Sequence, residues 1–398
     1  DDIISNGGNK TYLEVDGDVT IGGISGNGSG QQITSPFNLP GFPKIVTLTI
    51  DVAEGKSYNY SGMWRPNNWD GSNVTVLDII KNGKGTQEFS GWTTGYNTSP
   101  SYTGKLTVNE GTFIVSGSIF SDDSSIMYAT TGNGNRYARN GPLITLNGGI
   151  LEIQRDWSAG SGKALSYSLS ALDPAAILIN GGSIKFSKVN QNSYRGFTIG
   201  SNGGGIITDV DYTKPLTQYA SNITNWINGS NGGSITLSGS GNGTLAETLG
   251  VYGTWQNSAA LIKTGTGAWS VGGVNLKGGI TVNSGILTIT GNSTTAGDVI
   301  VTGGVLTGQS SVSLGTGQVK ISGGQVNVAG GFANDVILSG GTLNLGGNSS
   351  SSKITLNGGS ILGGQNYTGN AIITGNLDAG SNLKGNIDLQ SGSSLFGN

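Results

Sequence analysis

The amino-acid sequence predicts an all-β protein, a single-stranded right-handed parallel β-helix (β-solenoid) with loop insertions in its N-terminal two-thirds. Three observations support this prediction. Short segments alternate apolar and polar residues, which is the pattern of a strand with one buried face. A corner of small residues recurs roughly every 16–20 residues towards the C-terminus, a period typical of solenoids. These repeats also lack the i, i+3, i+4 spacing of an amphipathic helix.

Residues 280–398 contain the repeat in its plainest form, seven times over, beginning with ITVNSGILTI, VIVTGGVLTG and VKISGGQVNV. In the third copy Val319 and Ile321 flank Lys320. The abundant Val, Ile and Thr favour pleated strands. Because one copy cannot bury its apolar face alone, we expect the copies to stack as parallel strands, with tight corners in place of crossover helices.

The second position of each corner holds Gly or, once, Asn. Gly adopts a positive φ at no steric cost, and Asn is the next most tolerant residue. We therefore expect a left-handed backbone conformation at this position. The structural corners that follow the pattern are Gly111, Gly149, Gly182, Gly285, Gly304, Gly324, Gly341, Gly359, Asn376 and Gly392.

The earlier part of the chain uses the same elements, as in TYLEVDGDVTIGG and KIVTLTIDVAEG. The intervals between Gly111, Gly149 and Gly182 are 38 and 33 residues, which predict about two coils each. We expect one continuous solenoid with a decorated region at 1–260 and a regular Gly-corner region at 261–398. The long loops of the decorated region are expected at residues 121–140, 155–173 and 187–231.

A longer unit occurs twice, in residues 77–115 and 261–289. Its second copy reads LIKTGTGAWSVGG, a short spacer, then GGITVNSGILTI, and Lys263 corresponds to Lys81 of the first copy. This unit resembles the autotransporter-associated β-strand repeat, whose pattern is close to L-x-K-x-G-x-G-x-L-x-L-x-G followed by G-x-x-x-V-x-x-G-x-L. The second copy departs from it at Trp269, which replaces an aliphatic residue, and the first copy has an enlarged spacer.

The two copies cover about a fifth of the chain. The resemblance implies a β-helical passenger segment of Gram-negative or related bacteria, extracellular or at the cell surface, either displayed on the outer membrane or secreted. It does not choose an activity, because adhesins, proteases and toxins share this scaffold. Residues 281–398 lack the long amphipathic strands and aromatic girdles of the family's C-terminal barrel, which we expect to have been cut away, processed off or never present.

The composition restricts the chemistry that the chain can perform. The absence of Cys and His removes disulfides, thiol nucleophiles, the commonest general base and the commonest metal ligand. Charged residues make up 11% and the net charge is −3, so we do not expect nucleic acid or an anionic membrane as partner. No apolar run approaches the length of a membrane span. We expect no cofactor, no metal and no catalytic residue.

Aromatic residues are concentrated in the N-terminal two-thirds, since all seven Trp and twelve of thirteen Tyr lie at or before Trp269. Exposed aromatic side chains on loops suit stacking on sugar rings or contacts with proteins. The simpler alternative is that they pack on the coil surface. The candidate binding residues are Trp64, Trp69, Trp92, Tyr96, Tyr102 and Trp157. We expect Trp255 and Trp269 in the core, because both lie within strand patterns.

Two groups of carboxylates form the basis of an enzyme or Ca²⁺ hypothesis. Asp122 and Asp123 share a predicted loop with Arg136 and Arg139. Paired carboxylates suit Ca²⁺ and a nearby Arg suits polysaccharide cleavage, but adjacent residues of a strand point to opposite faces. Asp209 and Asp211 have the spacing of one face but lack further oxygen-rich neighbours. A solvated loop is the simpler interpretation of both groups.

The sequence therefore predicts a secreted or surface-exposed structural or adhesive β-solenoid without catalysis. One role is an adhesin stalk. The other is a subunit that self-associates through its solenoid ends into an extracellular fibre or matrix, because open strand edges template further pairing. Partners left open are a second copy, a host or cell-surface glycan, and a host protein. The alternative from a different class is a β-helical polysaccharide lyase or hydrolase, or a glycan-binding module.

Overall fold

The computed structural model describes residues 3–5, 11–27, 31–34, 44–65, 75–91, 105–117, 128–130, 136–138, 142, 144–154, 177–187, 197–209, 227–309, 314–328, 333–346, 353–362, 370–374, 376–379, 386–390, 392 and 394–396. Within these ranges every regular element is a β-strand and no helix occurs. The protein forms two compact units. Unit 1 is Asp1–Gly200 with Asp211–Lys214, and unit 2 is Ser201–Val210 with Pro215–Asn398.

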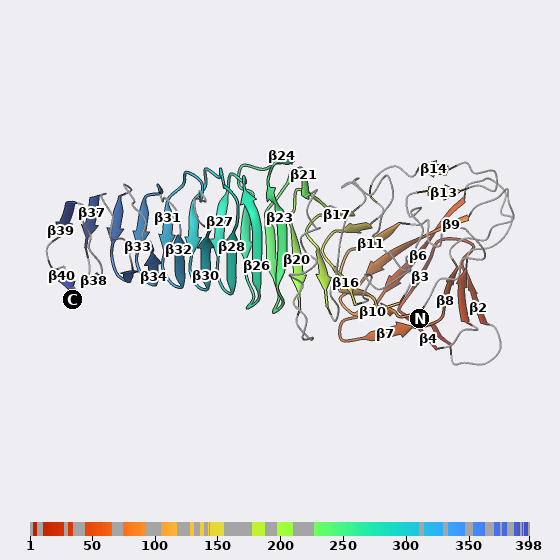
Figure 1. Ribbon diagram of the computed structural model, residues 1–398. Helices are drawn as coiled ribbons and strands as arrows, with labels where there is room; N and C mark the ends of the chain where they lie inside the picture. Colours follow the sequence, from red (N-terminus) through yellow and green to blue (C-terminus); the bar gives the residue numbers. More distant parts are fainter. Residues whose placement is uncertain are drawn as a thin grey trace. The chain divides into compact units, whose positions relative to one another are not determined.

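Unit 1 contains two parallel ladders, a short parallel sheet and one antiparallel hairpin (Figure 1). The first ladder runs through β1 (Ile3–Ser5), β4 (Ile24–Gly26), β7 (Ser57–Tyr60), β10 (Thr86–Phe89), β12 (Thr112–Val115), β16 (Ile150–Ile153) and β18 (Ser183–Phe186). The second runs through β3 (Val19–Ile21), β6 (Lys44–Asp51), β9 (Thr75–Asn82), β11 (Leu106–Val108), β15 (Ile144–Leu146), β17 (Ile177–Ile179) and β19 (Phe197–Ile199). The short sheet is β2 (Thr11–Glu14), β5 (Gln31–Thr34) and β8 (Met63–Arg65), and the hairpin is β13 (Tyr128–Thr130) with β14 (Arg136–Ala138).

Unit 2 contains two long parallel ladders and one strand pair. The first ladder runs through β20 (Gly204–Thr208), β22 (Ile235–Ser238), β25 (Ala260–Lys263), β27 (Gly279–Val282), β29 (Val299–Val301), β31 (Val319–Ile321), β33 (Val336–Leu338), β35 (Ile354–Leu356), β37 (Asn370–Ile373) and β39 (Asn386–Leu389). The second runs through β23 (Gly243–Leu249), β26 (Ala268–Val274), β28 (Ile286–Ile289), β30 (Val305–Gly308), β32 (Gln325–Val328), β34 (Thr342–Asn344), β36 (Ser360–Leu362), β38 (Asn376–Ala379) and β40 (Ser394–Phe396). The pair is β21 (Ile227–Gly232) with β24 (Tyr252–Trp255).

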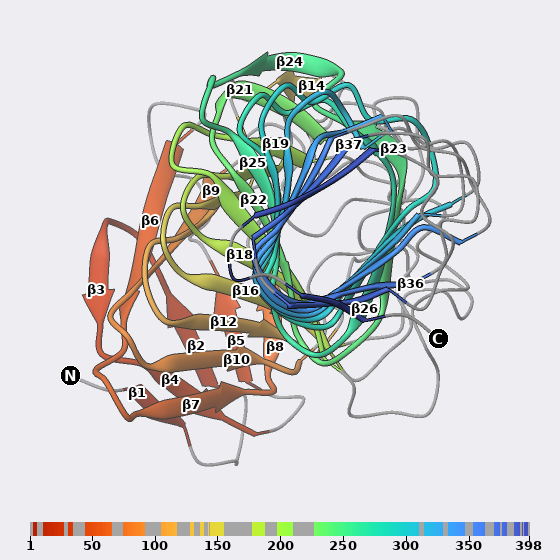
Figure 2. The same ribbon diagram turned by 90° about the vertical axis from the view of Figure 1, so that its left-hand side faces the viewer.

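From β25 onwards the chain enters the two long ladders of unit 2 alternately. From β27 onwards each strand therefore pairs in parallel with the strand two places before it, so one pass through both ladders makes one layer. Figure 2 shows the strands of the two ladders on different sides of this stack of layers. The predicted all-β fold of stacked parallel strands is confirmed at this level.

The core of unit 2 follows from the alternation in the sequence. In β31 the side chains of Val319 and Ile321 are buried and that of Lys320 is partly exposed, as the pattern predicts. The register stacks the second buried position of successive strands into one column, which contains Val282, Val301, Ile321, Leu338 and Leu356. Full burial of each such side chain contributes roughly 1.5–3 kcal/mol, so stacking supplies what a single layer lacks.

The backbone has positive φ at seven of the ten predicted corners, and Gly324 shows why. Its φ is +66°, and a Cβ there would lie 2.3 Å from the carbonyl oxygen of Gly304 in the previous layer. That oxygen accepts a hydrogen bond from the Gln325 amide at 2.9 Å, which holds the two corners together. The seven positions are Gly111, Gly285, Gly304, Gly324, Gly341, Gly359 and Gly392.

Two predicted corners have a different reason for Gly. Neither Gly149 nor Gly182 lies in the left-handed region, and the positive φ of the second corner belongs to Gly181, at +103°. A Cβ at Gly149 would lie 2.5 Å from Val108 Cγ1, and one at Gly182 would lie 2.6 Å from the carbonyl oxygen of Gly149. Close approach of the neighbouring layer, rather than φ, excludes a side chain at both positions.

Asn376 does not occupy the register position that the sequence alignment predicts. The ladder pairs Ser360 with Asp378, so Leu377 rather than Asn376 precedes the residue that corresponds to Ser360. The strand is displaced by one residue relative to the repeat pattern. As a result Ala379, and not Asp378, pairs with the buried Ile361.

Coil count and loop content also differ from the prediction. Strand β12 pairs directly with β16, and β16 pairs directly with β18. The interval from Gly111 to Gly149 is therefore one layer and not two, and so is the interval from Gly149 to Gly182. The predicted loop at 121–140 contains the hairpin β13–β14, and the one at 187–231 contains β19, β20 and part of β21. The predicted loop at 155–173 lies outside the described residues.

Candidate functional site

The predicted aromatic binding residues remain untested by the structure. Trp64 lies in β8, where its backbone pairs with that of Ile33. The other predicted binding residues, Trp69, Trp92, Tyr96, Tyr102 and Trp157, lie outside the described residues. The six residues therefore stay a prediction.

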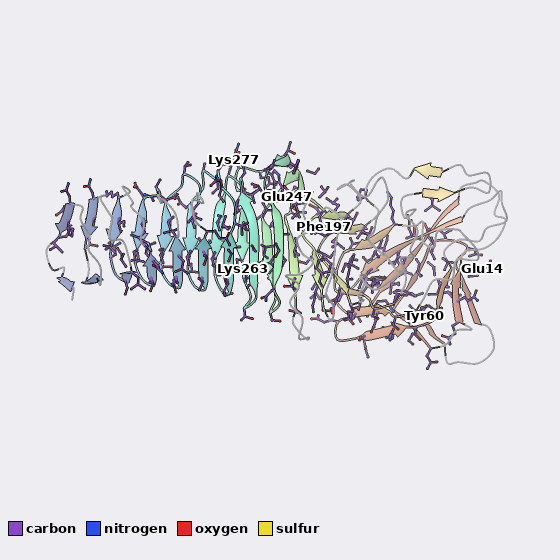
Figure 3. The ribbon with its side chains drawn as sticks, viewed as in Figure 1. Glu14, Tyr60, Phe197, Glu247, Lys263 and Lys277 are labelled. Carbon is purple, nitrogen blue, oxygen red and sulfur yellow. The ribbon has the colours of Figure 1, made fainter. Side chains whose placement is uncertain are left out.

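The two lysines of the repeated unit are buried, and each forms a lysine clamp, a set of hydrogen bonds from Nζ to carbonyl oxygens of two adjacent corners. Lys263 Nζ donates to the carbonyl oxygens of Thr264 at 2.5 Å, Gly265 at 2.9 Å and Ser284 at 3.3 Å. The last of these oxygens belongs to the next layer. The side chain is fully buried, and Figure 3 labels it among the stacked strands of unit 2. A core position thus holds a cation because three carbonyl oxygens converge on it.

Lys81 repeats this geometry in unit 1. Its Nζ donates to the carbonyl oxygens of Asn82 at 2.6 Å, Gly83 at 2.7 Å and Glu110 at 3.3 Å. Burial lowers the pKa of each lysine to about 8, although Asp51 and Glu110 oppose the shift at Lys81. The sequence signal for this clamp was a Lys at the second inward position of an otherwise apolar strand, followed by Gly-x-Gly. Its role is structural, because the amines are not accessible to a substrate.

A polar cluster lies on the first ladder of unit 1, around the largely buried Glu152. Its Oε1 accepts hydrogen bonds from Ser187 Oγ at 2.6 Å and Gln154 Nε2 at 2.7 Å. Its Oε2 lies 3.4 Å from Lys185 Nζ. Both carboxylate oxygens are therefore engaged within the fold, which is the arrangement of a buried ion pair with its hydrogen bonds made.

Of the carboxylates singled out in the sequence, Asp209 lies in the described part of the chain. Asp209 Oδ1 lies 3.4 Å from the Ser240 amide and 3.5 Å from Ser240 Oγ, so it contacts the next layer. Asp122, Asp123, Arg139 and Asp211 lie outside the described residues, and Arg136 lies in β14. Among the described residues no group of three or more acidic residues could hold a metal ion, and no helix there could span a membrane.

An exposed aromatic ledge lies at β24, where the β21–β24 pair ends. Val251 is 53% and Tyr252 40% exposed, and Trp255 is partly exposed. In the next layer the corresponding turn contains only the buried Leu276 and the exposed Lys277 (Figure 3). The Gly278 amide that follows donates to the carbonyl oxygen of Ala259 at 2.8 Å. Residues 250–257 therefore extend past the shorter turn that follows them. The expectation that Trp255 belongs to the core is wrong, whereas Trp269, at 1% exposure, is in the core as expected.

Backbone geometry holds the Trp255 indole in place. A Cβ at Gly229 would lie 2.8 Å from Trp255 Cε2 and Nε1, and one at Gly232 would lie 2.8 Å from Cε3. The indole therefore extends across both glycines of β21. Its Nε1 donates to the carbonyl oxygen of Tyr252 at 2.7 Å. Sequence reasoning missed this site because the alternation around Trp255 looks like that of a buried strand.

A search of curated proteins found similarity to the adhesin BmaC autotransporter of Brucella suis biovar 1 (strain 1330). The two sequences are 28% identical over 202 residues, which cover 44% of this chain and 6% of the relative. The chain thus corresponds to a small part of that protein. No family model matches the chain, and no solved structure matches it.

Proposed function

We propose that this chain is a passenger segment of an autotransporter-like adhesin, a right-handed parallel β-helix that is secreted or displayed on a bacterial surface. The observation that carries the proposal is the similarity to the Brucella adhesin autotransporter, together with the stacked parallel ladders of both units. Right-handedness is supported by the general rule that about 98% of parallel crossover connections within a sheet are right-handed. The scaffold holds exposed groups at a distance from the surface, and those groups contact a cell or matrix partner.

Surface labelling and attachment assays test this proposal. Antibodies against residues 227–309 should label intact cells of the source organism, and deletion of the coding region should reduce attachment of those cells to host cells or matrix. A strain that lacks only an unrelated surface protein serves as the control. Labelling that appears only after permeabilisation, or attachment that is unchanged on deletion, would contradict an adhesive role at the surface.

The absence of catalysis is part of the proposal. A cluster of carboxylates and basic residues in one groove would favour a polysaccharide lyase or hydrolase. Glu152 and Lys185 form a single carboxylate–lysine pair. Engagement of both Glu152 oxygens within the fold supports the structural role. Purified protein should release no reducing ends or unsaturated products from common polysaccharides. Release that depends on Glu152 would establish the enzyme alternative instead.

Self-association into a fibre or matrix stays a prediction. It rests on the general tendency of open strand edges to template further pairing. Light scattering over a range of protein concentrations measures the assembly state, and a Pro at Leu389 should reduce any assembly by removing a ladder donor. Particles of monomeric size at all concentrations would favour the adhesin stalk.

A further inference from the structure

We propose that the β24 ledge, formed by Tyr252, Trp255 and Gln256, is a binding platform for an uncharged glycan. The inference rests on the proposed adhesive function and deepens it, because it names the chemistry of the partner. No residue of the ledge belongs to the aromatic set that the sequence predicted. The platform is carried by unit 2 alone.

The indole of Trp255 is prepared for stacking before any ligand arrives. Gly229 and Gly232 carry no side chain, so the ring lies against the backbone of β21. The hydrogen bond from Nε1 to Tyr252 at 2.7 Å fixes its rotation and satisfies its polar atom. The ring remains partly exposed, and Tyr252 beside it is 40% exposed. A rigid aromatic surface costs little conformational entropy on binding, which favours recognition by stacking.

The backbone beneath the ring is strained. Asn231 has a φ of +53°, and it is the sole residue other than Gly with positive φ in the described part of the chain. It lies in the bulge between Gly229 and Gly232, where the β21–β24 register shifts. Its amide donates to Thr254 Oγ1 at 2.9 Å and its carbonyl accepts from Gln256 Nε2 at 3.1 Å. Strained backbone conformations concentrate at ligand-binding positions, and this one shapes the floor under the indole.

The polar groups around the ring match a neutral polyol. Residues 250–259, GVYGTWQNSA, contain hydroxyls and carboxamides but no charged side chain. Lys277 Nζ donates to the neutral Asn257 Oδ1 at 3.0 Å, so its charge lies at the border of the ledge and not within it. An apolar ring face bordered by amide and hydroxyl groups complements a sugar, which presents C–H bonds on one face and hydroxyls at its rim.

The same geometry disfavours an added peptide strand. Strand addition needs a straight edge with regularly spaced donors and acceptors. Here Gly253 has a φ of +75°, and the paired strand contains the bulge at Asn231. The edge is therefore irregular along the residues that are most exposed. Recognition through side chains fits this edge better than recognition through its backbone.

Binding of purified chain to an array of glycans tests the proposal. The probes are neutral β-glucans, mannans, galactans and N-acetylglucosamine oligomers, with heparin and polygalacturonate as anionic probes and a displayed peptide library as the protein probe. We expect binding to at least one neutral glycan and to no anionic glycan. Trp255→Ala should weaken this binding about tenfold or more, as loss of a central aromatic contact does. Trp255→Phe should retain part of it, and Tyr252→Ala should weaken it.

Leu362→Ala is the matched control, because Leu362 is 48% exposed in β36 of the same unit and lies outside the ledge. Circular dichroism checks that each variant is folded. If Trp255→Ala does not fold, the Phe and Tyr252 variants carry the test. No neutral glycan bound, binding insensitive to the ledge variants, or ledge-dependent binding of peptides alone would each overturn the proposal. Because this assay uses purified protein, its failure leaves the cell-attachment result intact.

Discussion

At the scale of single residues, two separate constraints select Gly at the corners. The first is a positive φ, which Asn tolerates better than a β-branched residue does. The second is the carbonyl oxygen of the previous layer, which lies too close to leave room for any Cβ. At Gly324 both act, since φ is +66° and the added Cβ would lie 2.3 Å from Gly304 O. At Gly55 only the first acts, since φ is +75° and nothing lies within 4 Å of the added Cβ.

We therefore expect Gly324→Asn to be nearly as harmful as Gly324→Val, contrary to the expectation from φ alone. Each should lower the free energy of unfolding by more than about 2 kcal/mol, because both force the layers apart. Gly55→Asn should cost less than about 1 kcal/mol. Urea denaturation of the three variants measures this. A small loss for Gly324→Asn beside a large one for Gly324→Val would show that φ alone governs the corner.

The lysine clamps also act at the scale of residues. An ammonium in the core is normally unfavourable, but the converging carbonyl oxygens of two layers need donors. Burial still lowers the pKa of Lys81 and Lys263 from 10.5 to about 8. Between these pH values the unfolded chain retains protons that the folded protein has lost, so the free energy of unfolding rises with pH.

The free energy of unfolding should be nearly flat below pH 8 in respect of these lysines. It should then rise between pH 8 and pH 9.5, by at most about 1.4 kcal/mol per pH unit for each lysine. Burial raises the pKa of Tyr60 above its usual range. Above about pH 10 the unfolded chain therefore loses a proton that the folded protein keeps, so the free energy of unfolding falls again. Urea denaturation at several pH values measures the slope. Lys263→Met should remove about half of it, and a flat profile in wild type would contradict the assignment.

At the scale of elements, hydrogen bonds across layers fix the ladders. Side-chain carboxylates contribute, since Asp298 Oδ1 accepts from the Gln318 amide at 3.1 Å and Oδ2 from Lys320 Nζ at 2.5 Å. The hydrogen bond from Lys320 is the main reason that the pKa of Asp298 is lowered. Such contacts select one register among several that a repetitive sequence permits. The displaced register of β38 shows that the repeat pattern alone does not choose it.

A pair of engineered cysteines tests the β38 register, and the chain has no natural Cys to interfere. Ser360→Cys with Asp378→Cys should form a disulfide, because paired residues of neighbouring strands lie at a Cα distance that disulfides span. Ser360→Cys with Leu377→Cys should not, since adjacent residues point to opposite faces. Thiol titration and peptide mass mapping give the answer. Efficient oxidation of the Leu377 pair instead would restore the alignment expected from sequence.

At the scale of the whole molecule, the two units each carry their own core. Ile321 is buried in β31 of unit 2 and Leu151 in β16 of unit 1. In a stacked architecture each layer contacts its neighbours, so stability is a sum of local terms. Damage to one unit should therefore spread along its own layers first.

We expect Ile321→Asp to abolish amide protection from hydrogen exchange in the strands of unit 2 while those of unit 1 remain protected. Leu151→Asp should give the reverse pattern. The reason is that an unpaired buried charge costs several kcal/mol at one layer and the loss passes to adjoining layers. Hydrogen-exchange mass spectrometry follows both units in one experiment. Simultaneous loss of protection in both units for both variants would show a single cooperative fold.

Some of the site could be predicted from sequence and some could not. The inward places of Val319, Ile321 and Trp269 follow from alternation, because burial of one strand face depends on residues in that strand. The sequence predicts a loop where the structure has the strands within residues 197–208, because GGG weakens the strand signal. The sequence predicts Trp255 in the core, because nothing local reveals that the following layer has a shorter turn.

The all-β class, the period-two core and the positive φ of seven of the ten expected corners could be predicted from the sequence alone, since these depend on covalent geometry and on local burial. The contents of the adjoining layer followed from the three-dimensional fold. It set one layer, rather than two, between Gly111 and Gly149, and the register at Asn376. It also supplied the carbonyl oxygens that Lys263 binds and the open position of Trp255. These features depend on which backbone segments meet across layers, and residues far apart in the chain make that choice together.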